Sequence, residues 1–91
     1  MYEWDDDKNK ANIARHRVAF DEAEQFAWEG ALVASDDRQD YRESRFVAVG
    51  YVGHRLHVLA FTERGDKVRV ISLRKANKRE VKRYEKAQAG R

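Results

Sequence analysis

Cysteine is absent from the sequence, and its absence excludes three kinds of site. Without cysteine, a disulfide framework, a thiolate metal site and a thiol nucleophile are all impossible. Small domains that lack disulfides fit the reducing environment of the cytoplasm. We therefore expect a cytoplasmic protein that does not act through a thiol.

Long apolar runs are also absent. Residues 1–7 are acidic and have neither the positive start nor the apolar core of a signal peptide, and no later stretch approaches the length of a membrane span. The 91 residues leave too little chain for two independent cores, but 42% of them are hydrophobic, which is enough to build one. The sequence therefore predicts a single folded domain over residues 1–91 that does not enter a membrane.

Motifs for nucleotide and metal cofactors are missing as well. The sequence has no Gly-rich phosphate loop, no His-Glu-x-x-His helix and no cysteine-containing metal pattern. The three histidines, His16, His54 and His57, are scattered along the chain. We expect neither a metal nor any other cofactor.

Charge is distributed unevenly along the chain. Residues 64–91 contain eleven Lys or Arg and three acidic residues, a net charge of +8, whereas residues 1–63 have a net charge of −5. A basic segment of this kind is suited to the phosphates of a polyanion such as RNA. The acidic part is suited to a partner, or simply keeps the molecule soluble.

Helix-capping residues predict the helices. Residues 5–7 are aspartates, which suit the N-cap and first turn of a helix that runs to about residue 15, because carboxylates accept hydrogen bonds from its unpaired N–H groups. Asp21 is expected to begin a second helix, which Gly30 ends. Asn77 and Glu80 have the spacing of a capping box and predict a C-terminal helix.

Between these helices the hydrophobic period changes from 3.6 to 2. Alternating runs at residues 45–51, 55–63 and 67–75, with Gly53 and Gly65 between them, predict a meander of antiparallel hairpins. The expected class is therefore α+β, with two N-terminal helices, an antiparallel sheet of three to five strands and a C-terminal helix.

Arginines on the last hairpin are the first candidates for chemistry. Strict alternation along residues 67–75 places Arg74 on the same face as Val68 and Val70. An arginine in such an apolar alternation needs a partner or a ligand, and its planar fork suits a phosphate. Arg64 and Glu63, before the turn, are further candidates, or else exposed hairpin residues that limit aggregation.

One face of the first predicted helix carries a second group of candidates. Lys8, Asn12 and His16 are spaced four residues apart and therefore share this face. The plainer interpretation is a solvated face whose C-terminal cation is favoured by the helix dipole.

The basic run at residues 74–84 is the third candidate. Its charge is nearly of one sign, whereas a surface that serves only solubility mixes signs. The candidate RNA-binding residues are Arg69, Lys75, Lys78 and Arg79. Tyr41 and Tyr84 could stack a base, although a tyrosine like Tyr84 belongs more often to the core.

Several ordered blocks of the sequence resemble one known family. They are Trp4-Asp5-x-x-Lys8-x-x-x-Asn12-x-x-x-His16-x-Val18-x-Phe20-x-Glu22-Ala23, Arg45-Phe46-Val47-Ala48-Val49-Gly50, Phe61-Thr62-Glu63-Arg64-Gly65-Asp66, Arg69-Val70-Ile71-Ser72-x-Arg74-x-Ala76 and Arg79-Glu80. With these blocks in the right order over nearly the whole chain, the sequence resembles the BrnT family of type II toxins.

The resemblance implies a compact RelE-like α+β fold and a metal-independent ribonuclease that arrests translation. It also implies neutralisation by a BrnA-like antitoxin, a ribbon-helix-helix protein that binds operator DNA. An antitoxin that dimerises would draw two toxins into a heterotetramer. One position departs from the family, which usually has glycine after the histidine, where this chain has Arg17. Arg17 must either avoid the left-handed conformation or tolerate strain.

RNA cleavage without a metal requires a base, an acid and cations that stabilise the phosphorane. We expect Arg64 and Arg74 to bind the scissile phosphate, with Lys8 as a further electrostatic contact. Either His16 or Glu63 is expected to transfer the proton. The catalytic candidates are thus Lys8, His16, Glu63, Arg64 and Arg74.

A competing hypothesis is a non-catalytic module that binds RNA or DNA through the same basic helix. Such a module needs positive charge but no acid–base pair, and it would release its RNA intact. A third hypothesis is a scaffold whose acidic and basic parts both bind protein partners.

Overall fold

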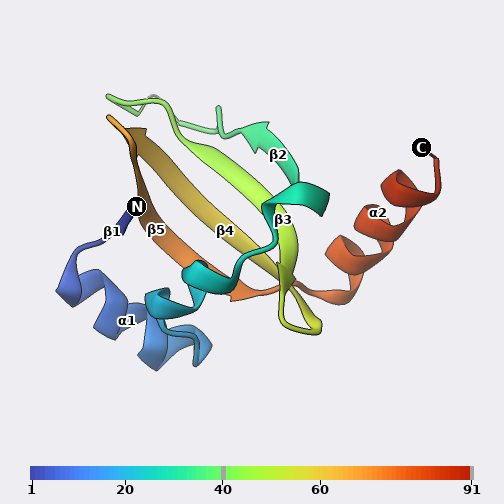
Figure 1. Cartoon of the computed structure of the whole chain (residues 1–91), viewed down its shortest axis with the longest axis horizontal. Helices are drawn as coiled ribbons and strands as arrows, with labels where there is room; N and C mark the ends of the chain where they lie inside the picture. The colour runs from blue at the N-terminus through green and yellow to red at the C-terminus, as the bar shows by residue number, and fades with distance from the viewer. Residues whose placement is uncertain (40, 91) are drawn as a thin grey trace.

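The computed structural model describes residues 1–39 and 41–90. Figure 1 shows one sheet with helices at its sides and the C-terminal helix projecting from one end. The elements in chain order are β1 (Tyr2–Glu3), α1 (Asp6–His16), the 3-10 helices η1 (Phe20–Gln25) and η2 (Trp28–Gly30), β2 (Leu32–Ser35), β3 (Phe46–Val52), β4 (Arg55–Arg64), β5 (Lys67–Lys75) and α2 (Lys78–Ala89). The α+β class and the strand number are as the sequence predicts.

The sheet is mixed and not wholly antiparallel as expected. Its strand order is β1-β5-β4-β3-β2, and β2 to β5 pair antiparallel. β1 pairs parallel with β5, with Tyr2 opposite Val68. This pairing joins parts of the chain that are far apart in the sequence, so no local sequence pattern predicts it. Because β1 covers only the first part of β5, the edge of the remaining part is left to α1, which contacts β5.

The segment expected to form a second α-helix forms two 3-10 helices instead. Phe20, Ala23 and Phe26 are all buried in the core and are spaced by three residues. A 3-10 helix has three residues per turn, so this spacing aligns the three side chains on one face. The core contact therefore favours the tighter helix.

The two faces of the sheet bury different sets of side chains. On the η1 face, Leu59, Phe61 and Leu73 pack with Phe20 and Phe26 of the η1 region. On the α2 face, Val58 and Leu56 pack with Tyr84 and Val81 of α2, because neighbouring residues of a strand point to opposite faces. The core position of Tyr84 is therefore confirmed.

A bulge in the β4–β5 pairing corrects the expected alternation of β5. The register shifts between Ala60 and Phe61, so that Ser72 lies opposite Ala60 but Val70 lies opposite Phe61. The extra residue, Ile71, moves Leu73 onto the same face as Val70, and both are buried. Arg74 is consequently on the α2 face and does not share a face with Val68 and Val70.

Both α-helices begin at the residues that the sequence indicates. Asp5 caps α1 by accepting hydrogen bonds from the N–H groups of Asp7 and Lys8, at 2.8 and 3.2 Å. Asn77 and Glu80 form the expected reciprocal capping box at the start of α2. In the part of the chain that the structure describes, neither helix is long and apolar enough to cross a membrane.

Candidate active site

α1 and the edge of β5 that β1 leaves uncovered form a shallow depression. It is lined by Lys8, Ala11, Asn12, Arg15, His16, Ile71 and Ser72. The structure thus brings together two of the predicted catalytic residues, Lys8 and His16, and places them beside the strand that carries Arg74. Figure 1 shows α1 alongside the sheet edge, far from the tip of the β4–β5 hairpin.

Asn12 fixes α1 against β5 in this position. Its buried side chain donates hydrogen bonds to the carbonyl oxygens of Val18 and Leu73, at 2.8 and 2.7 Å, and its Oδ1 accepts one from the N–H of Leu73 at 3.3 Å. A side chain that bonds both backbone groups of one strand residue fixes the helix laterally. Asn12 therefore positions the other side chains on its helix face, a structural task that the sequence pattern alone does not indicate.

The residue after His16 adopts the conformation in which a glycine is normally found. Arg17 has φ 63° and ψ 28°, and its N–H donates to the carbonyl of Ile13 at 2.8 Å. This left-handed turn ends α1 immediately after His16. Of the two alternatives open to Arg17, the structure shows the strained one.

His16 lies near two cations and is partly shielded from water. Burial, followed by the charges of Arg15 and Arg74, lowers the pKa of His16 below its ordinary value of 6.5. Its imidazole is therefore mostly neutral at pH 7 and can accept a proton. Arg74 is the smallest of these three causes, and Ser72, two residues before it in β5, lines the same depression as His16.

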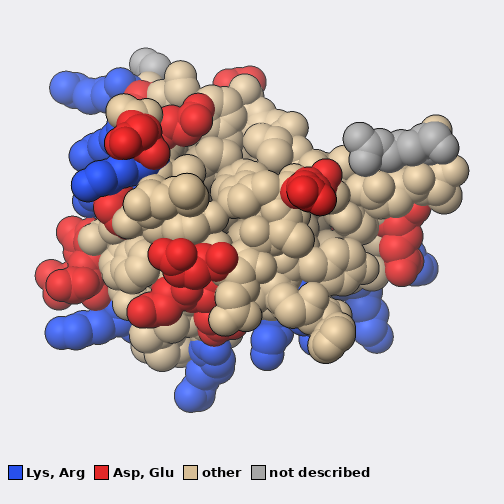
Figure 2. Space-filling view, viewed as in Figure 1, with Lys and Arg blue, Asp and Glu red and all other residues tan. Residues whose placement is uncertain are grey.

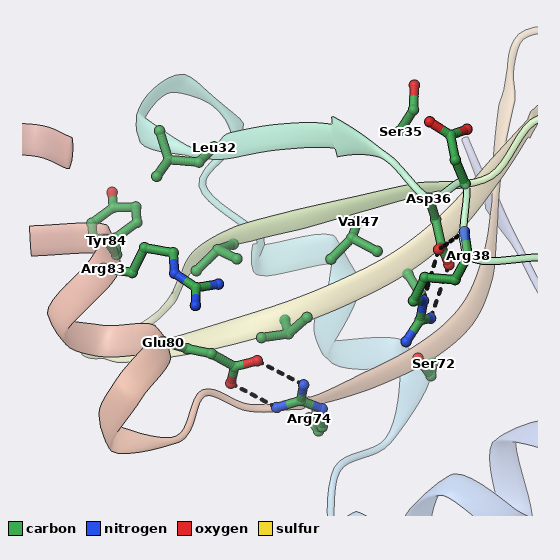
Figure 3. A pocket seen from close by; sticks show the side chains of 14 residues that line it. Leu32, Ser35, Asp36, Arg38, Val47, Ser72, Arg74, Glu80, Arg83 and Tyr84 are labelled. Atoms are coloured by element: carbon green, nitrogen blue, oxygen red, sulfur yellow. Dashed lines mark hydrogen bonds and ion pairs between the residues drawn. The ribbon is translucent and has the colours of Figure 1, made fainter.

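Arg74 is held by an ion pair with Glu80, at the first turn of α2. Its Nη1 and Nη2 donate to the two carboxylate oxygens of Glu80, each at 2.8 Å (Figure 3). Hydrogen bonding to Glu80 raises the pKa of Arg74, and the same pair lowers the pKa of Glu80. Arg74 therefore stays charged, in a fixed orientation.

Arg74 also lines a larger groove on the α2 face, with a volume of about 470 Å³. Figure 3 shows that strand side chains such as Val47 form its floor, while Glu80 and Arg83 of α2 and the pair Asp36–Arg38 stand at its rim. Ser72 lines both this groove and the depression beside α1. The two hollows therefore share Ser72, whereas Arg74 lines only the larger groove.

The pair Asp36–Arg38 at the rim was not anticipated. Arg38 donates two hydrogen bonds to the Asp36 carboxylate, at 2.8 and 2.9 Å, and lowers the pKa of Asp36 to about 2. In the sequence these residues belong to a polar loop with no distinctive spacing. Only the return of the chain across the sheet brings them to the groove.

Glu63 and Arg64 lie far from this site. Arg64 is opposite Lys67 at the turn, whereas Arg74 is opposite Val58, six residues away along β4. At about 3.3 Å per residue, this separation is roughly 20 Å. Arg64 forms an exposed ion pair with Glu43 at 3.3 Å. Glu63 borders a different, mainly apolar hollow.

The predicted RNA-binding residues are also spread over the surface. Arg69 pairs with Glu3 of β1 at 3.2 Å. Lys75, Lys78 and Arg79 are exposed where β5 passes into α2. Figure 2 shows the side of η1 and η2, where Lys and Arg lie mostly at the periphery and acidic side chains lie both near the centre and at the edges. Three of the four predicted RNA-binding residues thus lie at the β5–α2 junction that adjoins Arg74.

Neither of the two tyrosines predicted as candidates for base stacking exposes both faces of its ring. Tyr84 is buried and donates its hydroxyl to the carbonyl of Gly30 at 2.7 Å. The guanidinium of Arg45 covers the ring of Tyr41, 4.1 Å from its centroid. Within residues 1–39 and 41–90, no three His, Asp or Glu side chains are grouped as a metal site would require.

Comparison with known proteins places the chain in one family. A family model described as "Ribonuclease toxin, BrnT, of type II toxin-antitoxin system" matches residues 4–80, which include α1, the whole sheet after β1 and the first turn of α2. No curated protein sequence matches the chain.

Proposed function

Because the chain belongs to the BrnT family of ribonuclease toxins of type II toxin–antitoxin systems, we propose that it cuts RNA where α1 meets β5, using Lys8, His16 and Arg74. The observation that supports this proposal is that Lys8 and His16 line one depression with Ser72, which also lines the groove of Arg74. The lowered pKa of His16 keeps its imidazole mostly neutral there. A proton acceptor beside fixed positive charge is the combination that RNA cleavage needs.

In the proposed reaction, the imidazole of His16 takes the proton of a ribose 2′-hydroxyl. The 2′ oxygen then attacks the adjacent phosphorus and forms a 2′,3′-cyclic phosphate, and the bond to the 5′ oxygen breaks as that oxygen takes a proton from solvent water. Arg74 and Lys8 stabilise the additional negative charge on the phosphorane. Since these side chains supply the positive charge, we propose that the reaction proceeds without a metal ion.

Arg64 and Glu63 are left out of this proposed centre. A single phosphodiester cannot contact both Arg64 and Arg74 across roughly 20 Å of strand. His16 is therefore a better candidate than Glu63 for the proton transfer. Arg64 remains available to bind the RNA strand at a distance from the cut.

A cleavage assay on purified toxin tests the proposal. We expect Arg74→Ala and His16→Ala to lower kcat/KM by about 100-fold or more, as removal of a catalytic electrostatic or proton-transfer group does. Arg64→Ala, a matched change of an exposed, ion-paired arginine, is expected to lower it less than about 10-fold. Chelation with EDTA is expected to leave the wild-type rate unchanged.

The opposite ranking would contradict the proposed centre: full activity in Arg74→Ala and His16→Ala, with activity lost in Arg64→Ala. Thermal melts of each variant separate a loss of chemistry from a loss of folding. RNA that is bound but recovered intact would instead support the non-catalytic alternative.

Membership of the family also implies a cognate antitoxin and an RNA substrate. We propose that this antitoxin is a BrnA-like ribbon-helix-helix protein, that two toxins and an antitoxin dimer form a heterotetramer on operator DNA, and that the toxin acts in the cytoplasm. Co-purification followed by light scattering would test the stoichiometry.

A further inference from the structure

The guanidinium of Arg74 uses one of its two edges inside the protein. Its terminal edge, formed by Nη1 and Nη2, pairs with both oxygens of Glu80 at 2.8 Å. Nη1 additionally donates to the carbonyl of Lys75 at 3.3 Å. Of the five N–H groups of an arginine, these hydrogen bonds engage three.

The other edge of the guanidinium has N–H groups that these hydrogen bonds do not use. It consists of the Nε–H and the second N–H of Nη2, and Nε has no hydrogen-bond acceptor in the part of the chain that the structure describes. Arg74 is half-buried and lines the groove that shares the residue Ser72 with the His16 depression. A parallel pair of donors on an arginine edge matches two oxygens of a phosphate.

Glu80 is itself fixed by the fold. Its Oε1 accepts a hydrogen bond from the N–H of Asn77 at 2.8 Å, while Asn77 Oδ1 accepts one from the N–H of Glu80 at 2.8 Å. The carboxylate is therefore held by the start of α2 and in turn holds Arg74. This arrangement links a helix cap to the orientation of a guanidinium.

We propose that Glu80 is a positioning residue for RNA cleavage, which holds the terminal edge of Arg74 so that its Nε edge is presented to the scissile phosphate. This inference rests on the proposed role of Arg74. Glu80 does not touch the substrate, and its negative charge works against RNA binding. Glu80 favours catalysis because it fixes the orientation of the Arg74 guanidinium before the phosphorane forms.

The substitution Glu80→Gln separates orientation from charge. Gln retains an oxygen for the N–H of Asn77, but its amide N–H₂ would face the Nη2 donor of Arg74, so the guanidinium must turn. We expect kcat to fall by on the order of tenfold, because a misplaced catalytic group loses rate, while KM stays the same or decreases because a negative charge has gone. Glu85→Gln, an exposed residue of the same helix, makes the same change in net charge and is expected to keep the wild-type kcat.

A second variant, Glu80→Asp, keeps the charge but shortens the side chain, so it cannot hold both Arg74 and Asn77. It is expected to lower kcat as well, measured per folded molecule. If both Glu80 variants kept wild-type kcat while Arg74→Ala was inactive, the positioning role would be wrong and the proposed centre would stand. If Arg74→Ala itself kept full activity, the proposed centre would fail instead.

Discussion

At the scale of single residues, the environment of His16 makes a prediction about pH. Burial and the neighbouring cations lower the pKa of His16, so the neutral, proton-accepting form is already dominant at pH 7. If the neutral form of His16 is the base, kcat/KM rises as the pH increases through this lowered pKa and reaches a plateau above it.

Removing one neighbouring cation should move this pH profile in a defined direction. Arg15→Gln takes away the second-largest cause of the shift, so the pKa of His16 rises and the acid limb of the kcat/KM profile moves to higher pH. Lys10→Gln, an exposed change on the same helix, serves as the control and should leave the limb in place. An unmoved limb in Arg15→Gln would show that a group other than His16 titrates.

Arg17 predicts an unusual gain in stability. An L-residue in the left-handed region loses roughly 1–2 kcal/mol relative to the right-handed one, and glycine avoids that cost. We expect Arg17→Gly to raise the free energy of unfolding by about 1 kcal/mol, measured by urea denaturation. Arg17→Ala retains the left-handed strain and should give little or no gain, so equal stabilisation by both variants would disprove the strain.

At the scale of secondary-structure elements, Asn12 joins α1 to β5. Asn12→Ala leaves the carbonyls of Val18 and Leu73 without their side-chain donor in a buried place, which costs roughly 1–3 kcal/mol for an unsatisfied polar group. We expect destabilisation in this range and a lower cleavage rate in the molecules that remain folded, because Lys8 and His16 lose their fixed position. Asn9→Ala, which removes a single hydrogen bond to the N–H of Phe20, should affect stability less and the rate hardly at all.

The two α-helices have different roles in the proposed centre. α1 carries the proposed proton acceptor, while the first turn of α2 holds Arg74 through Glu80. β5 lies between them and supplies both Ser72 and Arg74. The proposed centre is therefore assembled from three elements, of which α1 is far from the other two in the sequence.

At the scale of the whole molecule, the basic C-terminal part predicts how RNA binding depends on salt. Lys78, Arg79 and Lys82 are exposed on α2, beyond the proposed centre. Replacing Lys78 and Lys82 with Gln should weaken RNA binding uniformly across sequences and raise KM. The slope of log K against the logarithm of the salt concentration should also become smaller in magnitude by roughly two, about one for each lysine that no longer binds a phosphate. The expected kcat is unchanged, and a large fall in kcat would place these lysines at the site of chemistry.

Local rules in the sequence determined much of this protein. The aspartates before α1, the Asn77–Glu80 capping box and the glycines between strands each act within a few residues, so the helix starts and the hairpins were predictable. The ordered motif blocks likewise sufficed to indicate the ribonuclease toxin family.

Tertiary structure determined the features that local sequence rules could not predict. The bulge beside Ile71 reversed the face of Arg74, the parallel pairing of β1 joined distant parts of the chain, and the core spacing of Phe20, Ala23 and Phe26 favoured 3-10 helices. It also separated Arg64 from Arg74, which look equivalent in the sequence. Each outcome depends on which residues pair or pack together in the folded chain, and a one-residue change of register moves a side chain to the opposite face of a sheet.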